Sequence, residues 1–393
     1  MSTYAIPEIT PGVYAVGSKD WKRRIFDCIA ATPQGTTYNT YLVRGADKTA
    51  LIDTIHKDFK DDLSGKINQI LGSHAIDYVI MNHAEPDHAG SIMHILNQCS
   101  AKLLCTKKGA ELAQVYYDVP DDRIQVVADG ETIDLGGKSL TFIHAPFIHW
   151  PETMMTWLAE DGVLFSCDFF SAHNTIGDFD TESEDIIHWA RKYYAEIMMP
   201  LAKMGRMAMA KLKNLDIKFI APSHGPIYRD PSKIMAHYTD WTNEKTAPKA
   251  IILYTSMYTF TEKIALTIAE NLKNQGIIVG AYDMVNTDAA ELINQLLDTR
   301  ALIIASPTLL GNIHPVIQYG MILIKTLRPP IKYGLFVNNY GWGKSATRFG
   351  VEFFEQAKID SIGVIEINGK PGDEDFANIT EASEILAKKI LAD

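Results

Sequence analysis

The sequence is poor in cysteine, has no excess of positive charge and contains no long apolar run. Its 393 residues include four cysteines, Cys28, Cys99, Cys105 and Cys167, none of them in C-x-x-C spacing. This spacing argues against a disulfide framework and against an iron–sulfur or rubredoxin-type site. We therefore expect reduced, buried thiols, as in a cytoplasmic protein.

The charge balance and the apolar runs exclude two kinds of partner. The formal net charge is -11, whereas a protein that neutralises nucleic-acid phosphates needs an excess of Lys and Arg. No apolar run reaches the roughly 18–20 residues of a membrane helix, and no export signal is visible at Met1–Tyr4. We expect neither nucleic acid nor a membrane as a partner.

The first part of the chain reads as a sheet-on-sheet domain. Residues 12–170 contain short strand-like runs that polar and glycine-containing turns separate. Residues 182–215 read as mostly helical, and Phe219–Ala221 as a further strand. This mixture predicts two packed sheets with outer helices. The clearest strand-like runs are Tyr41–Val43, Ala50–Ile52, Tyr78–Met81 and Thr141–Ile143.

The pattern changes near residues 246–249, after which strands and helices alternate. Such alternation within 145 residues predicts a doubly wound parallel sheet. We expect two domains, 1–247 and 248–393, in agreement with the usual size of roughly 100–200 residues per domain. The predicted strands are Ala250–Tyr254, Ile277–Tyr282, Ala301–Ala305, Tyr333–Val337 and Ser361–Ile367, with a helix over Thr261–Gln275.

A cluster of metal-binding residue types follows the strand-like run Tyr78–Met81. The segment Asn82–Gly90 carries four such side chains within six residues, and a helix over Ala89–Leu96 could begin beyond it. A surface loop of this composition without a metal is the alternative. More candidates follow other strand-like runs, however, where sites collect. The candidate metal ligands are His83, Glu85, Asp87, His88, His149, Asp168 and His224.

These candidates are four imidazoles and three carboxylates, too many for one tetrahedral zinc ion. They suit two metals that share one carboxylate, for which Asp168 is the candidate. Two divalent ions, three carboxylates and a bridging hydroxide sum to zero charge, which limits the cost of burial. Binuclear zinc hydrolases with a similar cluster usually carry His-x-His-x-Asp-His, and Glu85 stands at the second histidine of that pattern. An oxygen ligand at this position favours iron or manganese. Redox chemistry is therefore favoured over metal-assisted hydrolysis.

Three further loops predict a flavin site. The loop 254–262 between a strand and a helix offers hydroxyls and backbone N–H groups to a phosphate, although a simple capping turn is the alternative. It contains no lysine, so it is not a Walker-type loop. Tyr340 and Trp342 could stack on an isoalloxazine ring at the same sheet edge. The predicted FMN-binding residues are Ser256, Met257, Tyr258, Thr259, Phe260, Thr261, Ser306, Pro307, Thr308, Leu309, Gly311, Asn312, Asn338, Asn339, Tyr340, Gly341, Trp342 and Gly343.

With these motifs the chain resembles the flavodiiron proteins over nearly its whole length. The resemblance implies an α/β protein, with an N-terminal metallo-β-lactamase-like αββα sandwich and a C-terminal flavodoxin-like doubly wound parallel sheet. The matching landmarks are Gly35–Asn39, His83–His88, His149–Glu152, Asp168, Pro222–Gly225, Ser256–Met257, Thr261–Lys263, Ser306–Thr308 and Tyr340–Trp342.

The resemblance also implies a function. His83, Glu85 and His149 would hold one iron, Asp87, His88 and His224 the other, and Asp168 with a hydroxide or oxo group would bridge them. These seven residues are also the predicted catalytic residues. Electrons would pass from an external donor, a rubredoxin or a reduced deazaflavin, through FMN to the irons. The enzyme would reduce dioxygen to water, nitric oxide to nitrous oxide, or both, as a cytoplasmic head-to-tail homodimer or dimer of dimers.

Several positions depart from the family pattern. Phe26-Asp27-Cys28 replaces the common Phe-His-Gly near the irons, which bears on the choice of gas. We expect His144 to be a supporting or structural residue and His173 to line the pocket. Two other functions remain: a binuclear zinc hydrolase fused to an electron-transfer flavodoxin domain, and a non-catalytic flavin module that binds a partner.

Overall fold

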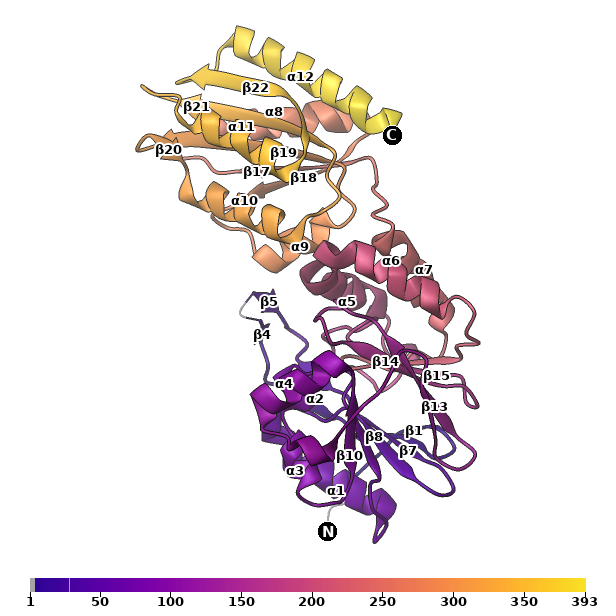
Figure 1. The fold of residues 1–393 in the computed structure, drawn as a ribbon. Helices are drawn as coiled ribbons and strands as arrows, with labels where there is room; N and C mark the ends of the chain where they lie inside the picture. Colours follow the sequence, from indigo (N-terminus) through magenta and orange to yellow (C-terminus); the bar gives the residue numbers. More distant parts are fainter. Residues whose placement is uncertain (1–3, 28) are drawn as a thin grey trace. The chain divides into compact units, whose positions relative to one another are not determined.

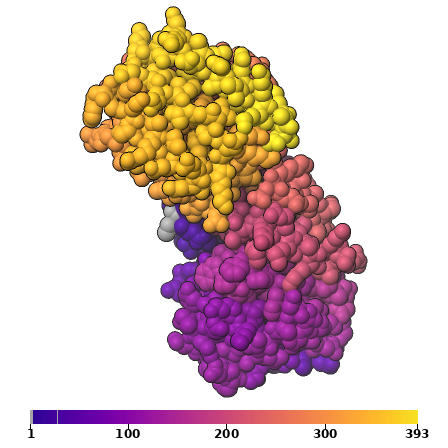
Figure 2. Space-filling view, turned by 45° about the horizontal axis from the view of Figure 1, so that its top comes forward, coloured from indigo at the N-terminus to yellow at the C-terminus, as the bar shows by residue number. Residues whose placement is uncertain are grey.

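The computed structural model describes residues 4–27 and 29–393. The chain forms two compact units, Met1–Thr239 and Asp240–Asp393, which the colour scale of Figure 2 distinguishes. Both contain helices and strands, so the predicted mixed α/β class is confirmed. Among the described helices, none has the length and apolar character needed to cross a membrane. Cys28, part of a predicted family departure, lies outside the described residues.

The first unit contains two main sheets (Figure 1). The seven-stranded sheet has the order β1-β2-β7-β8-β9-β10-β11, with β1 Glu8–Thr10, β2 Val13–Ala15, β7 Tyr41–Arg44, β8 Thr49–Ile52, β9 Tyr78–Ile80, β10 Lys102–Cys105 and β11 Ile124–Val126. The five-stranded sheet runs in sequence order, with β12 Thr132–Asp134, β13 Ser139–His144, β14 Met154–Leu158, β15 Val163–Cys167 and β16 Phe219–Pro222. Two two-stranded sheets complete the described strands of this unit, β3 Ser18–Asp20 with β6 Thr36–Tyr38 and, between them in the sequence, β4 Ile25–Phe26 with β5 Ala30–Ala31.

Two apolar cores hold these layers together. One lies between the sheets, where Ile52 and Ile80 from the first sheet meet Phe142 and Phe165 from the second. The other lies between the first sheet and its helices α1 Lys60–Leu71, α3 Ile92–Leu96 and α4 Lys107–Tyr117. Such burial on both faces is the layered packing that the strand-like runs predict. The remaining helices are α2 Pro86–Ala89, α5 Ile186–Tyr193, α6 Ala202–Leu212 and α7 Pro231–Thr242.

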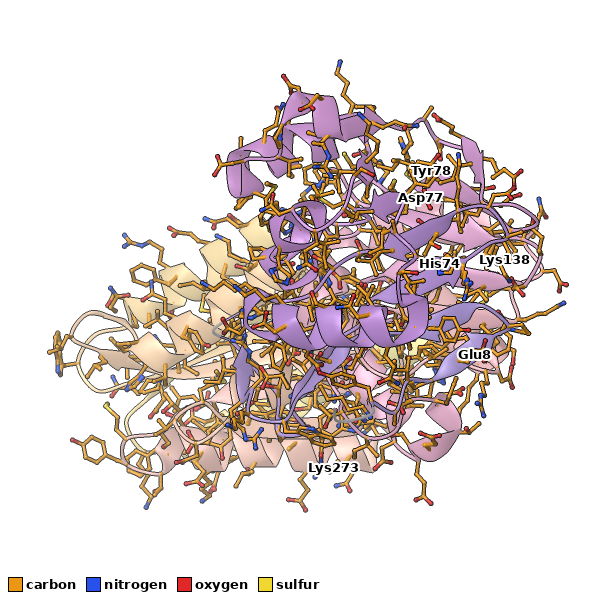
Figure 3. The ribbon with its side chains drawn as sticks, turned by 90° about the horizontal axis from the view of Figure 1, so that it is seen from below. Glu8, His74, Asp77, Tyr78, Lys138 and Lys273 are labelled. Atoms are coloured by element: carbon orange, nitrogen blue, oxygen red, sulfur yellow. The ribbon has the colours of Figure 1, made fainter. Side chains whose placement is uncertain are left out.

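The cluster of metal-binding residue types follows the interior strand β9, at the carboxyl end of that strand. The start of β9, where Figure 3 labels Asp77 and Tyr78, is tied to the start of β8. The Asp77 carboxylate accepts from the Thr49 N–H (2.8 Å), and Lys48 Nζ donates to the Tyr78 hydroxyl (2.8 Å). β9 runs parallel to both β8 and β10. The segment after β9 therefore emerges at the same edge as the ends of its neighbours.

The helix predicted over Ala89–Leu96 is wrong in its bounds. The structure has two short helices instead, α2 from Pro86 and α3 from Ile92. Proline at the first helical position starts α2 early. Gly90 then passes so close to the chain that an added Cβ would lie 2.3 Å from the Pro86 carbonyl oxygen. The tight passage separates the two helices and presents Asp87 and His88 on a single buried turn.

The second unit is built on a parallel sheet with the order β18-β17-β19-β21-β22, that is, 2-1-3-4-5 within the unit. Its cores lie on both faces, against α8 and α12 on one side and α9, α10 and α11 on the other (Figure 1). The strands are β17 Lys249–Tyr254, β18 Ile278–Asp283, β19 Ala301–Leu309, β21 Tyr333–Tyr340 and β22 Asp360–Asn368. The helices are α8 Phe260–Asn274, α9 Ala289–Leu296, α10 Pro315–Leu327, α11 Ala346–Ala357 and α12 Asp373–Ala392.

Two of these strands run longer than the sequence predicts. β19 continues to Leu309 and forms a hairpin with β20 (Asn312–Ile313), while β21 continues to Tyr340. The hairpin turn is Leu310-Gly311, with φ of 51° and 77°. A two-residue turn with positive φ at both positions matches the twist of its strands. Residues 306–309 and 338–340, predicted as loops, are thus strand ends.

Candidate metal and cofactor sites

The seven predicted metal ligands come together at one place in the first unit. Four lie just after β9, one in the connection from β13 to β14, one after β15 and one after β16. Each of the four histidines directs its Nε2 atom toward the carboxylates. Asp87, His88, Asp168 and His224 are buried, and His83 has no exposed surface at all. The seven predicted ligands therefore form one cluster, although His83 and His224 are 141 positions apart in the sequence.

One half of the cluster contains His83, Glu85 and His149. Oε2 of Glu85 lies 3.2 Å from Nε2 of His83 and 3.1 Å from Nε2 of His149. The two imidazole nitrogens are 3.3 Å apart. Three donor atoms that face one another at this spacing can converge on a single cation.

The other half contains Asp87, His88 and His224. Oδ1 of Asp87 lies 3.3 Å from Nε2 of His88, and Oδ2 lies 3.2 Å from Nε2 of His224. His224 donates from Nδ1 to the Thr37 carbonyl (2.5 Å), which turns its Nε2 toward the cluster. Fixing one ring nitrogen in this way sets which nitrogen is free to bind a metal.

Asp168 lies between the two halves. Its Oδ2 is 3.2 Å from Nε2 of His149 and 3.5 Å from Nε2 of His83. Its Oδ1 is 3.1 Å from Nε2 of His88 and 3.5 Å from Nε2 of His224. One carboxylate oxygen thus faces each half, which is the arrangement that a bridging carboxylate needs.

The charges of the cluster are strongly coupled. Burial by itself raises the pKa of Asp168, yet the nearby imidazoles of His88 and His149 hold that pKa well below its usual range. Burial opposes a charge on His149 too, but Asp168 and Glu85 raise its pKa to about 10. The pKa of His88 is likewise raised, against its burial, by Asp168 and Asp87. The carboxylates require positive charge beside them.

The donor set fits divalent metal ions. Both oxygens of Asp87, both oxygens of Asp168 and both ring nitrogens of His88 are buried and lack a hydrogen-bond partner in the described chain. Buried polar atoms of this kind are rare and call for a missing partner. The donors form two groups, and within each group the ligand atoms all lie within 4.8 Å of one another. The groups are His83 with Glu85, His88 and Asp168, and Asp87 with His88 and His224. A metal would supply the positive charge and replace the imidazole protons.

One supporting residue was not predicted from the sequence. Glu152 is buried, and its Oε1 lies 2.7 Å from Nδ1 of His83 and accepts from the Ala84 N–H (2.9 Å). A carboxylate on the far nitrogen of a metal-binding histidine fixes the ring and raises its basicity. The only signal in the sequence was its place in the landmark His149–Glu152.

The departures from the family pattern lie in different surroundings. Asp27 lines a pocket of about 180 Å³ together with Arg23, Phe26, His56, Glu85, Pro86 and Asp87. Burial and the Glu85 charge raise the pKa of Asp27. His173 lines the metal cluster as expected, with its ring 5.0 Å from that of His224 and 4.4 Å from that of Phe26.

His144 lies apart from this cluster. It ends β13, where its N–H donates to Asp129 (2.8 Å) and its carbonyl accepts from Lys211 (2.7 Å). Within the described chain it makes no ring contact or hydrogen bond with a predicted ligand. Of the two roles expected for His144, supporting the site or stabilising the fold, these bonds favour the second.

The predicted phosphate loop lies at the carboxyl edge of the second sheet. It leads from β17 to α8, whose N-cap residue Thr259 makes no side-chain capping bond. The Ser256 hydroxyl is buried and has no hydrogen-bond partner in the described chain. Free N–H groups at a helix start and an unpaired hydroxyl are groups that a phosphate would satisfy. The residues present therefore fit a phosphate-bearing cofactor.

The other two predicted segments, 306–312 and 338–343, reach the same edge, because β17, β19 and β21 are parallel neighbours. The edge exposes Met257 (44%), Tyr258 (76%), Leu310 (89%) and Trp342 (87%). An added Cβ at Gly341 or Gly343 would meet no atom within 4 Å, so the space beside this loop is open. Asn338 and Asn339 differ, since both are buried.

Comparison with known proteins agrees with this architecture. Residues 36–225 match the family described as ODP family beta lactamase. A nitric oxide reductase of Moorella thermoacetica is 37% identical, over 97% of this chain and 98% of that protein. A coenzyme F420H(2) oxidase of Methanothermobacter marburgensis is 32% identical, over 98% and 99%.

Solved structures give the same answer. The rubredoxin oxygen:oxidoreductase of Desulfovibrio gigas superposes with a TM-score of 0.94 at 29% identity, covering 99% of both chains. The flavodiiron protein of Giardia intestinalis gives 0.93 at 27% identity, covering 100% of this chain and 98% of that one. The first unit thus has a metallo-β-lactamase-like fold. The chain as a whole belongs to the flavodiiron protein family.

Proposed function

We propose that this protein is an oxidoreductase that reduces dioxygen to water, nitric oxide to nitrous oxide, or both, at a pair of iron ions. The observation that carries the proposal is the position of Asp168, whose two oxygens each face two imidazoles, one pair in each half of the cluster. Glu85 and Asp87 add one oxygen donor to each half. Mixed oxygen and nitrogen donors favour iron over zinc.

The second domain, over residues 248–393, is proposed to be flavodoxin-like and to bind FMN. Its strand order 2-1-3-4-5 supports this, because sheets of that order bind ligands beyond the carboxyl ends of their strands. The unpaired Ser256 hydroxyl and the free start of α8 support a phosphate site there. Trp342 and Tyr340 lie at the same edge and are available to the flavin ring.

When bound, two ferrous ions and a fully reduced FMN supply the four electrons that turn dioxygen into two waters, whereas coupling of two nitric oxide molecules needs two. The protein's own groups hold and orient these cofactors. His83, Glu85 and His149 would bind one ion. Asp87, His88 and His224 would bind the other, with Asp168 shared. Glu152 and the Thr37 carbonyl fix the rings of His83 and His224.

The electron donor is proposed to be a separate molecule, a rubredoxin or a reduced deazaflavin. Relatives named for each of these donors support both choices. We also propose a head-to-tail homodimer, or a dimer of such dimers, in the cytoplasm. The exposed apolar side chains Tyr258, Leu310 and Trp342 support a covered edge in the second domain.

The test uses one preparation in two metal forms. Iron-loaded, anaerobically reduced protein should consume dioxygen or nitric oxide with an artificial donor, and zinc-loaded protein should consume neither. Comparing the two gases under the same donor assigns the preference. Thioester or lactam hydrolysis by the zinc form would instead support a hydrolase. Protein that holds FMN but gains no activity with iron would support a non-catalytic module.

A further inference from the structure

Two adjacent asparagines close the end of β21, and their side chains are already occupied. Asn338 has 0% and Asn339 has 9% of its surface exposed. Nδ2 of Asn339 donates to the carbonyls of Ile367 (3.1 Å) and Gly369 (2.8 Å). Both residues are predicted FMN contacts, but a fully buried side chain offers a ligand no surface.

Asn338 uses every hydrogen-bonding group of its amide. Its Oδ1 accepts from the Thr308 hydroxyl (2.9 Å), and its Nδ2 donates to the Thr347 hydroxyl (3.1 Å) and to the Lys344 carbonyl (3.3 Å). Because a carbonyl can only accept, the nitrogen must face Lys344 and the oxygen must face Thr308. The amide therefore has one orientation.

These bonds join two different cofactor segments. Thr308 lies on β19, two residues before the Leu310-Gly311 turn. Lys344 and Thr347 lie beyond the loop that follows β21, at the start of α11. One buried amide thus spans the gap between the hairpin and the Trp342 loop.

The network continues to a carboxylate. Thr347 donates to Oε1 of Glu366 (2.7 Å), and Lys344 Nζ lies 2.8 Å from Oε2. The loop itself has few contacts, since Trp342 is 87% exposed and Gly341 and Gly343 have open space beside them. Its position is consequently set by its anchored ends.

We infer that Asn338 is a positioning residue of the flavin site, which holds the β19 hairpin and the Trp342 loop at a fixed separation without touching the cofactor. The inference rests on the proposed binding of FMN. Interactions of the protein with the flavin ring set both its affinity and its reduction potential. A change in the separation of the two loops should alter both quantities, whereas a loss of general stability would leave the potential of bound flavin unchanged.

The experiment removes FMN from the full-length protein and titrates it back, following flavin fluorescence, and then measures the potential of the bound flavin. Asn338→Leu has nearly the same volume but removes the hydrogen bonds that the amide makes to three other groups. We expect at least about a tenfold weaker FMN affinity and a shifted potential. Thr347→Val removes one bond from the same amide. It should act in the same direction but less strongly, and it serves as the test if Asn338→Leu does not fold.

The matched control is Asn294→Leu, the same substitution at another buried asparagine of this unit, on α9. It should lower the melting temperature and leave FMN affinity and potential unchanged. Asn338→Leu protein that binds FMN as tightly as the wild type, at an unchanged potential, would overturn the inference alone. Wild-type protein that takes up no FMN would overturn the flavin assignment and the inference together.

Discussion

Nδ1 of His83 lies 2.7 Å from Oε1 of Glu152, and the same oxygen accepts from the N–H of Ala84. The carboxylate therefore orients the ring and the backbone of the segment that carries the metal-type cluster. Glu152 and His83 are both buried, so their contact is shielded from solvent. The pair ties the loop after β9 to the connection between β13 and β14.

Removing the charge of Glu152 should weaken metal binding. Glu152→Gln keeps the shape but lowers the basicity of His83, and we expect iron affinity to fall by about 10–100-fold. Competition with a chelator of known affinity measures the change. Glu160→Gln, at a carboxylate that accepts from the Ser139 N–H far from the cluster, is the control. Equal iron affinity for both variants would contradict the role given to Glu152.

Asp168→Asn should abolish the two-metal site while leaving the flavin in place. The amide cannot offer an anionic oxygen to each half of the cluster, so iron content should fall and gas reduction should stop. Metal analysis, FMN absorbance and gas uptake are measured on one sample. Asp178→Asn, which breaks an ion pair with Lys19, is the matched control. Full gas reduction by the Asp168 variant would sink the assignment of the site.

Leu310 places an exposed apolar side chain in the β19–β20 turn, in a backbone conformation that costs stability. Its φ is 51° and 89% of it is exposed, a conformation that favours asparagine or glycine. Leu310→Asn should raise the free energy of unfolding by roughly 1 kcal/mol, the order of the left-handed penalty. Denaturant unfolding checks this value. If a second copy of the chain covers this edge, sedimentation should also show that the Leu310→Asn variant dimerises more weakly. A lower free energy of unfolding for the variant would refute the argument that Leu310 is strained.

The buried thiol of Cys105 should make stability pH-dependent at high pH. Burial raises its pKa from 9.0 to about 12. The unfolded chain loses this proton first, so the stabilisation is complete below pH 9 and is lost as the pH rises toward 12. The difference in unfolding free energy between the wild type and Cys105→Ala, followed from pH 8 to 11, isolates this group. A difference that stays constant with pH would contradict the raised pKa.

Much of the secondary structure could be predicted because its signals are local. The second domain's strands β17, β19 and β21 begin within one residue of their predicted starts. Continuous apolar runs mark such strands wherever they lie in space. The end of β17 at Tyr254 was also predicted, but β19 and β21 run past their predicted ends, because pairing with β20 and with neighbouring strands holds the extra residues in strand form. That pairing depends on distant segments.

The candidate metal site divides in the same way. His83, Glu85, Asp87 and His88 stand within six residues, and His149, Asp168 and His224 follow strand-like runs, so residue type and place were enough to propose all seven. The sequence alone thus determined which side chains could bind metal. How they divide between two halves was implied only by the family resemblance. Residue type and spacing do not give it, because it depends on which oxygen of Asp168 faces which ring.

Only the tertiary structure decided the supporting roles. Glu152 is 69 positions from His83, and a glutamate after a proline has no local feature that separates it from a surface carboxylate. Asn338 was predicted to contact the cofactor because it lies at a strand end, yet burial and three hydrogen bonds turn it inward. The chemical type of a side chain, and so its ability to bind a metal or donate a hydrogen bond, is given directly by the sequence. Orientation and burial belong to the packed chain, because neighbours distant in sequence set them.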